Sequence, residues 1–165
     1  MSPTQTPELE EETRIFAELY RPLRRFAAVV GPLETDPDDL LQEAVARTLR
    51  HRRLDQLDNP GAYLRKTLVN LASNQRRGFA INRRALTRLS ATNDRGSGDV
   101  YPSDLTELMR LPSGERAVLY LSEVEGYRYA EIGRMLGCSE AAARKRALRA
   151  RRHLYRAITG EVANG

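Results

Sequence analysis

The sequence has one cysteine, Cys138, no tryptophan, two histidines and no long apolar run. A single cysteine excludes an intramolecular disulfide, and two histidines far apart in the sequence lack the spacing of a metal site. The longest apolar run, Phe26–Val30, is far too short to cross a bilayer. The polar, acidic start of the chain does not have the pattern of a signal peptide. We therefore expect a cytoplasmic protein with no metal, no cofactor and no membrane insertion.

Lysine is also scarce, because only Lys66 and Lys145 among the 27 basic residues are not arginine. Arginine is the cation best suited to bidentate and stacked contacts with phosphates and bases. The formal net charge is +5, but residues 44–95 and 144–165 are strongly basic, whereas the segment before each of them is acidic. The two basic blocks predict two separate contacts with a polyanion, although either block alone is also consistent with a solvated surface of mixed charge.

Every element that the pattern allows us to recognise is helical. The first helix is expected from Leu9 to Val30, and Pro22 inside it predicts a kink or a division into two helices. Asp36 and Asn59 are each followed by proline, which predicts that the second and third helices begin there. The third helix is expected to end near Gly78, with a basic extension after it. The sequence thus predicts an all-α fold.

The chain changes character over residues 90–103, where Gly, Ser, Asn, Asp and Pro dominate without any period. This composition predicts a flexible linker between two small helical domains. We expect the first domain over residues 9–89 and the second over residues 104–159. Helices near Asp104–Leu111 and over Ser113–Glu125 are expected at the start of the second domain.

The segment Ala130–Leu154 has the pattern of a helix-turn-helix: a short helix, a turn that starts at Gly137, and a longer helix rich in alanine and arginine. In such a unit the second helix packs one stripe on the preceding helices and places another in the major groove of DNA. Ala143, Ala147 and Ala150 share one face, and most of the cations lie off it. A solvated basic helix in an ordinary bundle is the alternative interpretation.

The two halves together resemble the sigma-70 superfamily of bacterial transcription initiation factors, in its two-domain extracytoplasmic-function (ECF) form. The segments "DPDDLLQEAVARTL" and "NPGAYLRKTLVNLASNQRR" resemble sigma region 2, and "LPSGERAVLYLSEVEGYRYAEIGRMLGCSEAAARKRALRARRHL" resembles region 4. The resemblance implies a promoter-specificity factor, not an enzyme, that binds core RNA polymerase and directs initiation at a specific regulon. It also implies promoter DNA as a ligand, and an anti-sigma factor as a candidate partner.

The resemblance implies three contact surfaces. The family's D-L-x-Q-E pattern implies that core polymerase is bound by Asp39, Leu40, Gln42 and Glu43. The third helix implies that the minus-ten element is bound by Arg65, Lys66, Asn70, Arg76 and Arg77, with a pocket for a flipped base in the loop Leu54–Tyr63. The last helix implies that the minus-thirty-five element is bound by Arg144, Lys145, Leu148, Arg149 and Arg151. One departure is the run Ala141-Ala142-Ala143, where the family usually has Gly-Thr-Val.

The same residues bear on three other functions. A stand-alone helix-turn-helix regulator with an N-terminal dimerisation or sensing module remains the alternative, but such a module has no need for "DLLQE" followed by a basic helix with Asn70. Without the family, Gln42 and Glu43 also suit solvated positions, and Asn70 suits a surface amide. An enzyme is disfavoured because the sequence shows no nucleophile–base pair, metal cluster or phosphate-binding glycine loop. A sigma-like partner mimic that never binds DNA is disfavoured by the arginine-rich last helix.

Overall fold

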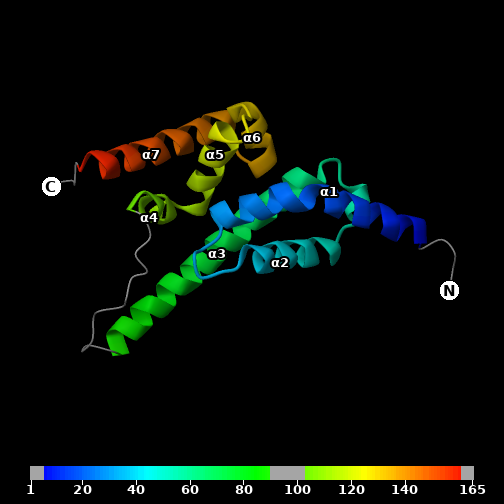
Figure 1. The fold of residues 1–165 in the computed structure, drawn as a ribbon, viewed down its shortest axis with the longest axis horizontal. Helices are drawn as coiled ribbons and strands as arrows, with labels where there is room; N and C mark the ends of the chain where they lie inside the picture. Colours follow the sequence, from blue (N-terminus) through cyan, green and yellow to red (C-terminus); the bar gives the residue numbers. More distant parts are fainter. Residues whose placement is uncertain (1–5, 90–102, 161–165) are drawn as a thin grey trace.

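The computed structural model describes residues 6–89 and 103–160, and every regular element within them is helical, which confirms the all-α prediction (Figure 1). The elements are α1 (Thr6–Val30), α2 (Pro37–Leu49), a 3-10 turn η1 (Leu54–Gln56), α3 (Pro60–Leu89), α4 (Ser103–Arg110), α5 (Ser113–Glu123), α6 (Tyr129–Leu136) and α7 (Glu140–Thr159). We refer to α1–α3 as the N-terminal half and to α4–α7 as the C-terminal half. The predicted linker lies almost wholly outside the described residues.

The second and third helices begin where the sequence predicts. The Asp36 carboxylate accepts a hydrogen bond from the backbone N–H of Asp38 at 2.7 Å, and the Asn59 side chain accepts one from the N–H of Ala62 at 2.9 Å. Each cap satisfies a backbone donor that has no partner inside its helix. Proline then occupies the first helical position, where its missing N–H has no cost.

Two predicted interruptions do not occur. The first helix runs through Pro22 without a division, because Leu19 before it and Phe26 after it pack against the same core. The third helix does not end near Gly78 but continues to Leu89. Glycine inside a helix costs only about 1 kcal/mol relative to alanine, which is too little to end a helix by itself.

One hydrophobic core runs through both halves. The α5–α7 group packs on one side of the N-terminal half, with α5 against α1 and α3, and α6 against α3 (Figure 1). Phe26 on α1 and Tyr120 on α5 meet across this interface, with ring centroids 6.2 Å apart. Side chains that are fully or almost fully buried come from both halves and include Leu23, Leu41, Leu64, Leu68, Val118, Leu121 and Ile132.

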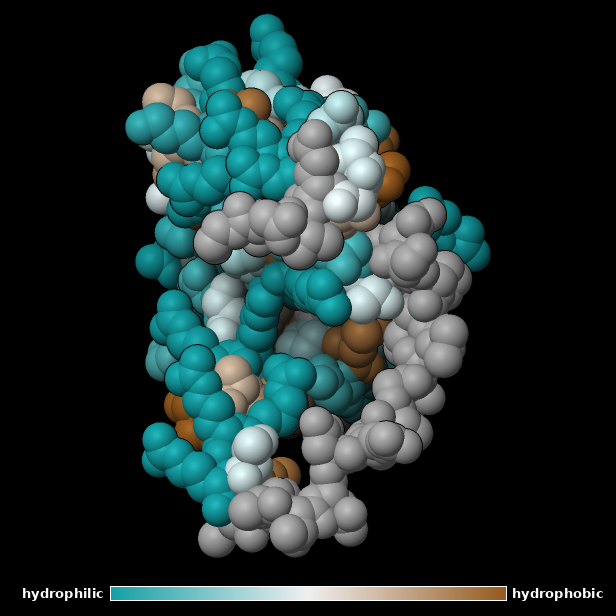
Figure 2. All heavy atoms as spheres, turned by 90° about the vertical axis from the view of Figure 1, so that its left-hand side faces the viewer, coloured by the Kyte–Doolittle hydropathy of each residue, from teal (hydrophilic) through white to brown (hydrophobic). Residues whose placement is uncertain are grey.

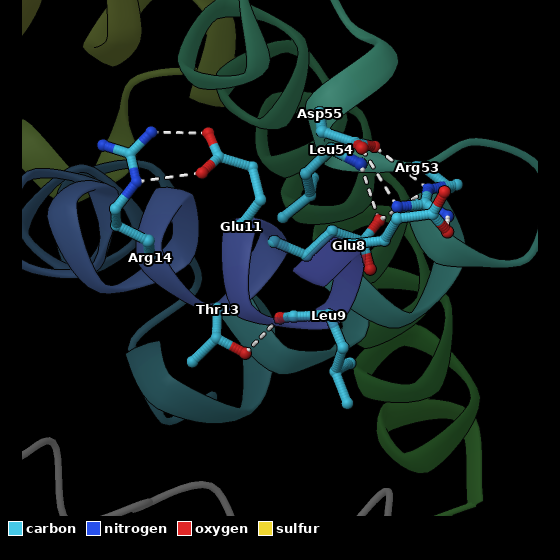
Figure 3. Close-up of polar contacts among 9 residues, drawn as sticks. Glu8, Leu9, Glu11, Thr13, Arg14, Arg53, Leu54 and Asp55 are labelled. Carbon is cyan, nitrogen blue, oxygen red and sulfur yellow. Dashed lines mark hydrogen bonds and ion pairs between the residues drawn. The ribbon is translucent and has the colours of Figure 1, made fainter. Parts of the chain in front are cut away.

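The start of α1 holds the loop between α2 and α3 in place (Figure 3). The Arg53 guanidinium forms an ion pair with Glu8 on α1 and another with Asp55 in η1, the latter at 3.0 Å. The backbone N–H of Leu54 donates to the Glu12 carboxylate at 3.1 Å. The contacts with Glu8 and Glu12 join segments more than 40 residues apart, and they fix the loop that leads into α3.

The start of α2 is tied to α1 through Asp38, and this contact should depend on pH. The Asp38 carboxylate accepts hydrogen bonds from the Tyr20 hydroxyl at 2.6 Å and from Arg24 Nε at 3.1 Å. The Tyr20 bond, followed by the Arg24 bond, lowers the pKa of Asp38 below its usual value of 3.8. Because the folded-state pKa is depressed, the contribution to stability is complete above the unfolded-state pKa and is lost as the pH falls through the folded-state pKa.

We therefore expect the stability difference between wild type and Asp38→Asn to be constant from about pH 5 to 7 and to shrink below about pH 4. Urea unfolding of both proteins across this range measures the difference. A gap that stays the same down to pH 3 would contradict the role of the charged carboxylate.

Candidate nucleic-acid interface

The turn between α6 and α7 has the geometry of a helix-turn-helix. Gly137 adopts a left-handed conformation with φ of 72°, and the N–H of Cys138 returns to the carbonyl of Gly133 at 2.9 Å. The Ser139 hydroxyl caps α7 by accepting from the N–H of Ala142 at 3.0 Å. A Cβ atom on Gly133 would lie only 2.6 Å from the Cys138 carbonyl oxygen. The close approach of α6 to the turn therefore requires glycine at position 133.

The alanine stripe of α7 faces inward, as the sequence predicts. Ala143, Ala147 and Ala150 are fully buried, and α7 packs on both α5 and α6. Ile132 on α6 and Leu121 on α5 are fully buried in the same core region. Because the alanines occupy the packed face, most arginines of α7 are exposed, whereas Arg146 is half-buried beside Cys138.

Two of the cations on α7 are exposed and, among the described residues, unpaired. Lys145 and Arg149 are exposed, and neither has an ion-pair partner within the described parts of the chain. Leu148 lies between them in the sequence and is 46% exposed. Figure 2 views the molecule from the end where α7 and the last turns of α3 lie, and hydrophilic side chains cover most of its upper part, over α7.

Two other expected contact residues of α7 already have partners. Arg144 forms an ion pair with Glu140 at 2.8 Å and lies over the Tyr129 ring at 5.6 Å. Arg151 forms an ion pair with Glu123 at the end of α5. Both pairs are exposed, so they contribute little to stability and can be exchanged for phosphate contacts.

The α2 surface divides into exposed polar residues and a buried leucine. Asp39 and Gln42 are exposed, and Glu43 accepts a hydrogen bond from Arg47 Nε at 2.6 Å, which lowers the pKa of Glu43. Leu40 is only 1% exposed and packs in the core. The expectation that Leu40 contacts a partner directly is therefore corrected. Leu40 instead anchors α2 to the hydrophobic core.

Arg65 and Arg76 on α3 are occupied by the C-terminal half. Arg65 is 6% exposed, forms an ion pair with Glu125 at 3.1 Å, and lies 5.9 Å from the centroid of the Phe26 ring. Arg76 donates to the backbone carbonyls of Arg110 and Leu111, the former at 2.5 Å. In this arrangement of the halves neither guanidinium is free to hold a phosphate, contrary to the expectation from the sequence. Arg77 is exposed.

Lys66 and Asn70 are exposed at a cleft between the two halves, which we call the interdomain cleft. Arg146 and Arg149 on α7 line the same cleft from the other side, and its volume is about 390 Å³. The structure therefore brings part of the predicted minus-ten surface and part of the predicted minus-thirty-five surface together.

A second cavity, which we call the α2–α3 hollow, lies between the end of α2 and the start of α3, with a volume of about 330 Å³. Its lining consists of Arg47, Thr48, Arg50, His51, Tyr63 and Thr67. Tyr63 is 38% exposed, whereas Leu54 is 2% exposed. The cavity thus coincides with the predicted loop Leu54–Tyr63 only at the Tyr63 end. The basic run "RTLRHRR" at the end of α2 supplies the cations of this cavity. The sequence did not show that this run lies opposite Tyr63.

Groups of three or more potential metal ligands are absent from residues 6–89 and 103–160. Within those same residues no helix has the length and apolar character needed to cross a membrane.

An all-helical chain with a helix-turn-helix and cations on its outward face is a DNA-binding protein of the helix-turn-helix class. Family models place it more narrowly. The model for sigma-70 region 2 matches residues 15–79, and the model for sigma-70 region 4 matches residues 105–154.

Individual relatives agree with the family models. The ECF RNA polymerase sigma factor SigM of Mycobacterium tuberculosis is 30% identical over 158 residues, an alignment that covers 88% of this chain and 76% of SigM. The fold is similar to that of the sigma factor RpoE of Bartonella quintana, solved in complex with the anti-sigma factor NepR, with a TM-score of 0.59 and 19% identity over 91% of this chain and 98% of RpoE. The chain belongs to the ECF family of sigma-70 sigma factors, and members of this family are transcription initiation factors and not enzymes.

Proposed function

We propose that this protein binds core RNA polymerase in the cytoplasm and directs it to the promoters of a particular regulon. One observation carries the proposal: the same chain has two features suited to DNA. The C-terminal half has a helix-turn-helix with exposed cations on its second helix, and the N-terminal half has a basic hollow with an exposed tyrosine. A stand-alone regulator needs only the first of these features. A factor that reads duplex DNA at one element and melts it at another needs both.

The outward face of α7 is proposed to read the minus-thirty-five element in the major groove. Lys145 and Arg149 have no ion-pair partner within the described residues, and Arg144 and Arg151 can exchange surface carboxylates for phosphates. Arg149 is our candidate for a base contact, because arginine pairs with the guanine edge through two hydrogen bonds. Leu148 is exposed beside it and can contact a thymine methyl group.

The α2–α3 hollow is proposed to hold a base that has left the duplex of the minus-ten element. Tyr63, Thr67 and Asn70 follow one another at spacings of four and three, so they form one stripe along α3. Seven residues of helix span about 10.5 Å, which is about the length of three stacked nucleotides. Tyr63 offers a ring for stacking, and Arg47, Arg50 and His51 surround the same hollow. Asn70 then lies where the next bases pass, and Lys66 and Arg77 are proposed to hold phosphates.

Core polymerase is proposed to bind on α2 through Asp39, Gln42 and Glu43, which Leu40 supports from the core. An anti-sigma factor is a proposed further partner, since the structurally similar RpoE was solved with one. Residues 9–89 and 104–159 are proposed as the two functional domains, with residues 90–103 as the linker. A stand-alone helix-turn-helix regulator is the competing function.

Gel filtration with purified bacterial core polymerase tests the proposal. We expect wild type to co-elute with core polymerase and the double variant Gln42→Ala/Glu43→Ala to elute alone. The Glu43–Arg47 pair is exposed to solvent and contributes little to stability, so the variant should remain folded. The control is Glu10→Ala/Asn82→Ala, which removes one carboxylate and one amide from exposed positions elsewhere.

Co-elution of the control and not of the α2 variant would support core binding on α2. If folded wild type binds DNA but fails to co-elute with the polymerase, the competing function as a stand-alone regulator is correct.

A further inference from the structure

The last turns of α3 have no place in the core or in the sites described so far. The match to the sigma-70 region 2 model ends at residue 79, and the match to region 4 begins at residue 105. We refer to Ala80–Leu89, the part of α3 beyond the first match, as the α3 extension. We propose that Arg84 and Arg88 of this extension bind phosphates of the double-stranded DNA between the minus-ten and minus-thirty-five elements, which we call the spacer. The proposal rests on the proposed function, because it lengthens the DNA contact of α3.

The α3 extension projects from the fold. After the buried Leu71 and Ala72, no side chain of α3 up to Arg88 is buried, and those from Ile81 to Arg88 are all exposed. Figure 1 shows the last turns of α3 running past α1 and α2. Arginine, alanine and leucine are good helix formers, and here they only prolong a helix that the core has nucleated. The chain thus keeps a regular helix where packing does not require one, and its surface is left for a partner.

The charge of this segment is of one sign. Residues 76–89 contain five arginines and no acidic residue. Arg77, Arg84 and Arg88 are exposed, and none of them forms an ion pair with another residue that the structure describes. A basic block without neutralising carboxylates attracts a polyanion, and arginine holds phosphate groups through paired hydrogen bonds. A phosphate backbone is therefore the partner that fits the α3 extension.

The arginines of the extension continue the stripe that begins at Tyr63. Beyond Asn70 the same spacings of four and three continue through Asn74, Arg77, Ile81, Arg84 and Arg88. Positions at these spacings share one face of an α-helix. Ile81 is 64% exposed, so this face is not covered by the rest of the described chain. The face proposed to follow the minus-ten bases thus runs without a break into a face that carries phosphate-binding side chains.

A duplex fits the α3 extension better than a melted strand does. Residues 80–89 contain no aromatic side chain on which unpaired bases could stack. With a rise of about 1.5 Å per residue, Arg84 and Arg88 lie about 21 and 27 Å beyond Asn70 along α3. This distance equals about six to eight base pairs of duplex. Because α3 leads on to the half that is proposed to bind the minus-thirty-five element, the extension points from the minus-ten element towards the spacer.

The variant Arg84→Ala/Arg88→Ala tests the contact, and we call it the stripe variant. The extension should remain helical in it, because alanine has the highest helix propensity. The matched control is Arg83→Ala/Arg25→Ala, which also removes two exposed arginines. Arg83 lies in the extension but off the stripe, and its Nε donates to the carbonyl of Phe79 in the same helix at 3.4 Å. Arg25 lies on α1, and neither control residue is assigned to DNA or to polymerase.

Fluorescence anisotropy of labelled promoter DNA with each holoenzyme measures the contribution to binding. The promoter is one that wild-type holoenzyme selects from a randomised library. At ~0.1 M salt we expect the stripe variant to bind about tenfold more weakly than wild type and the control to bind like wild type. The slope of the logarithm of affinity against the logarithm of salt concentration should fall by about two for the stripe variant, because two phosphate contacts are lost. Equal affinities and slopes for the stripe variant and the control would overturn the proposal.

Neutral methylphosphonate linkages in the spacer locate the contact. We place them about six to eight base pairs from the base that Asn70 is proposed to contact, where Arg84 and Arg88 should reach the DNA. The neutral linkages should weaken binding by wild type and by the control. They should leave binding by the stripe variant unchanged, because its contact with these phosphates is already lost. Equal weakening of all three proteins would show that the two arginines act elsewhere, and would overturn the proposal.

Other partners of the extension would give different results. Weaker co-elution of the stripe variant with core polymerase would place an acidic polymerase surface there. Normal promoter binding with fewer full-length transcripts would place the nascent RNA there, and either result would overturn the spacer contact. If wild type itself fails to co-elute with core polymerase, the proposed function falls and takes this proposal with it. If wild type co-elutes and the stripe variant behaves like the control, only the spacer contact is refuted.

Discussion

Tyr63→Ala is expected to reduce promoter opening by roughly 5- to 150-fold at unchanged protein concentration, because base–aromatic stacking contributes about 1–3 kcal/mol per base. The ring lies at the α2–α3 hollow and is 38% exposed, so a base can reach it. A base that leaves the duplex gives up its stacking and pairing, and the ring replaces part of that loss. Permanganate reactivity of the melted segment, with holoenzyme on a supercoiled promoter, measures the effect.

Tyr63→Phe is the matched control, since it keeps the ring and removes only the hydroxyl. We expect it to open promoters almost as well as wild type. Asn70→Ala should also impair opening more than initial binding, because Asn70 lies on the same stripe of α3, seven residues further along. Equal permanganate reactivity for Tyr63→Ala and wild type would show that the hollow does not receive a base.

The parts of the fold that could be read from the sequence are those that depend on neighbouring residues. Asp36 and Asn59 cap their helices through bonds to residues two and three positions away, and Gly137 adopts the left-handed turn. The face of α7 that is buried follows from alanine spacing alone. Pro22 and Gly78 led to wrong expectations. Pro22 does not divide α1, because residues before and after it pack on the same core. Gly78 does not end α3, because its low helix propensity costs too little to stop a helix that continues to Leu89.

The interface between the halves could not be read in this way. The ion pair of Arg65 with Glu125 joins residues 60 positions apart, and the bonds of Arg116 to the backbone at the end of α1 span about 85 positions. Nothing in the local pattern distinguishes these arginines from those expected to bind phosphates. In an arginine-rich chain, the choice between an internal carboxylate and a ligand phosphate is made by tertiary contacts, so the sequence alone assigns too many cations to DNA.

Arg149→Ala is expected to weaken recognition of the minus-thirty-five element by about 1–3 kcal/mol, or roughly 5- to 150-fold, and to relax the preference for guanine at a single position. Arg149 is exposed at the rim of the interdomain cleft and has no ion-pair partner within the described residues, so its removal leaves no buried charge unpaired. Lys145→Ala should instead weaken all sequences about equally and reduce the salt slope by about one, because lysine carries a point charge to the phosphates. Arg156→Ala, near the end of the same helix, is the control for net charge. Selection of promoters from a randomised library by each holoenzyme separates these cases. If Arg149→Ala leaves the sequence preference unchanged at every position, Arg149 contacts the DNA phosphate backbone, and Leu148 is the remaining candidate on α7 for a base contact.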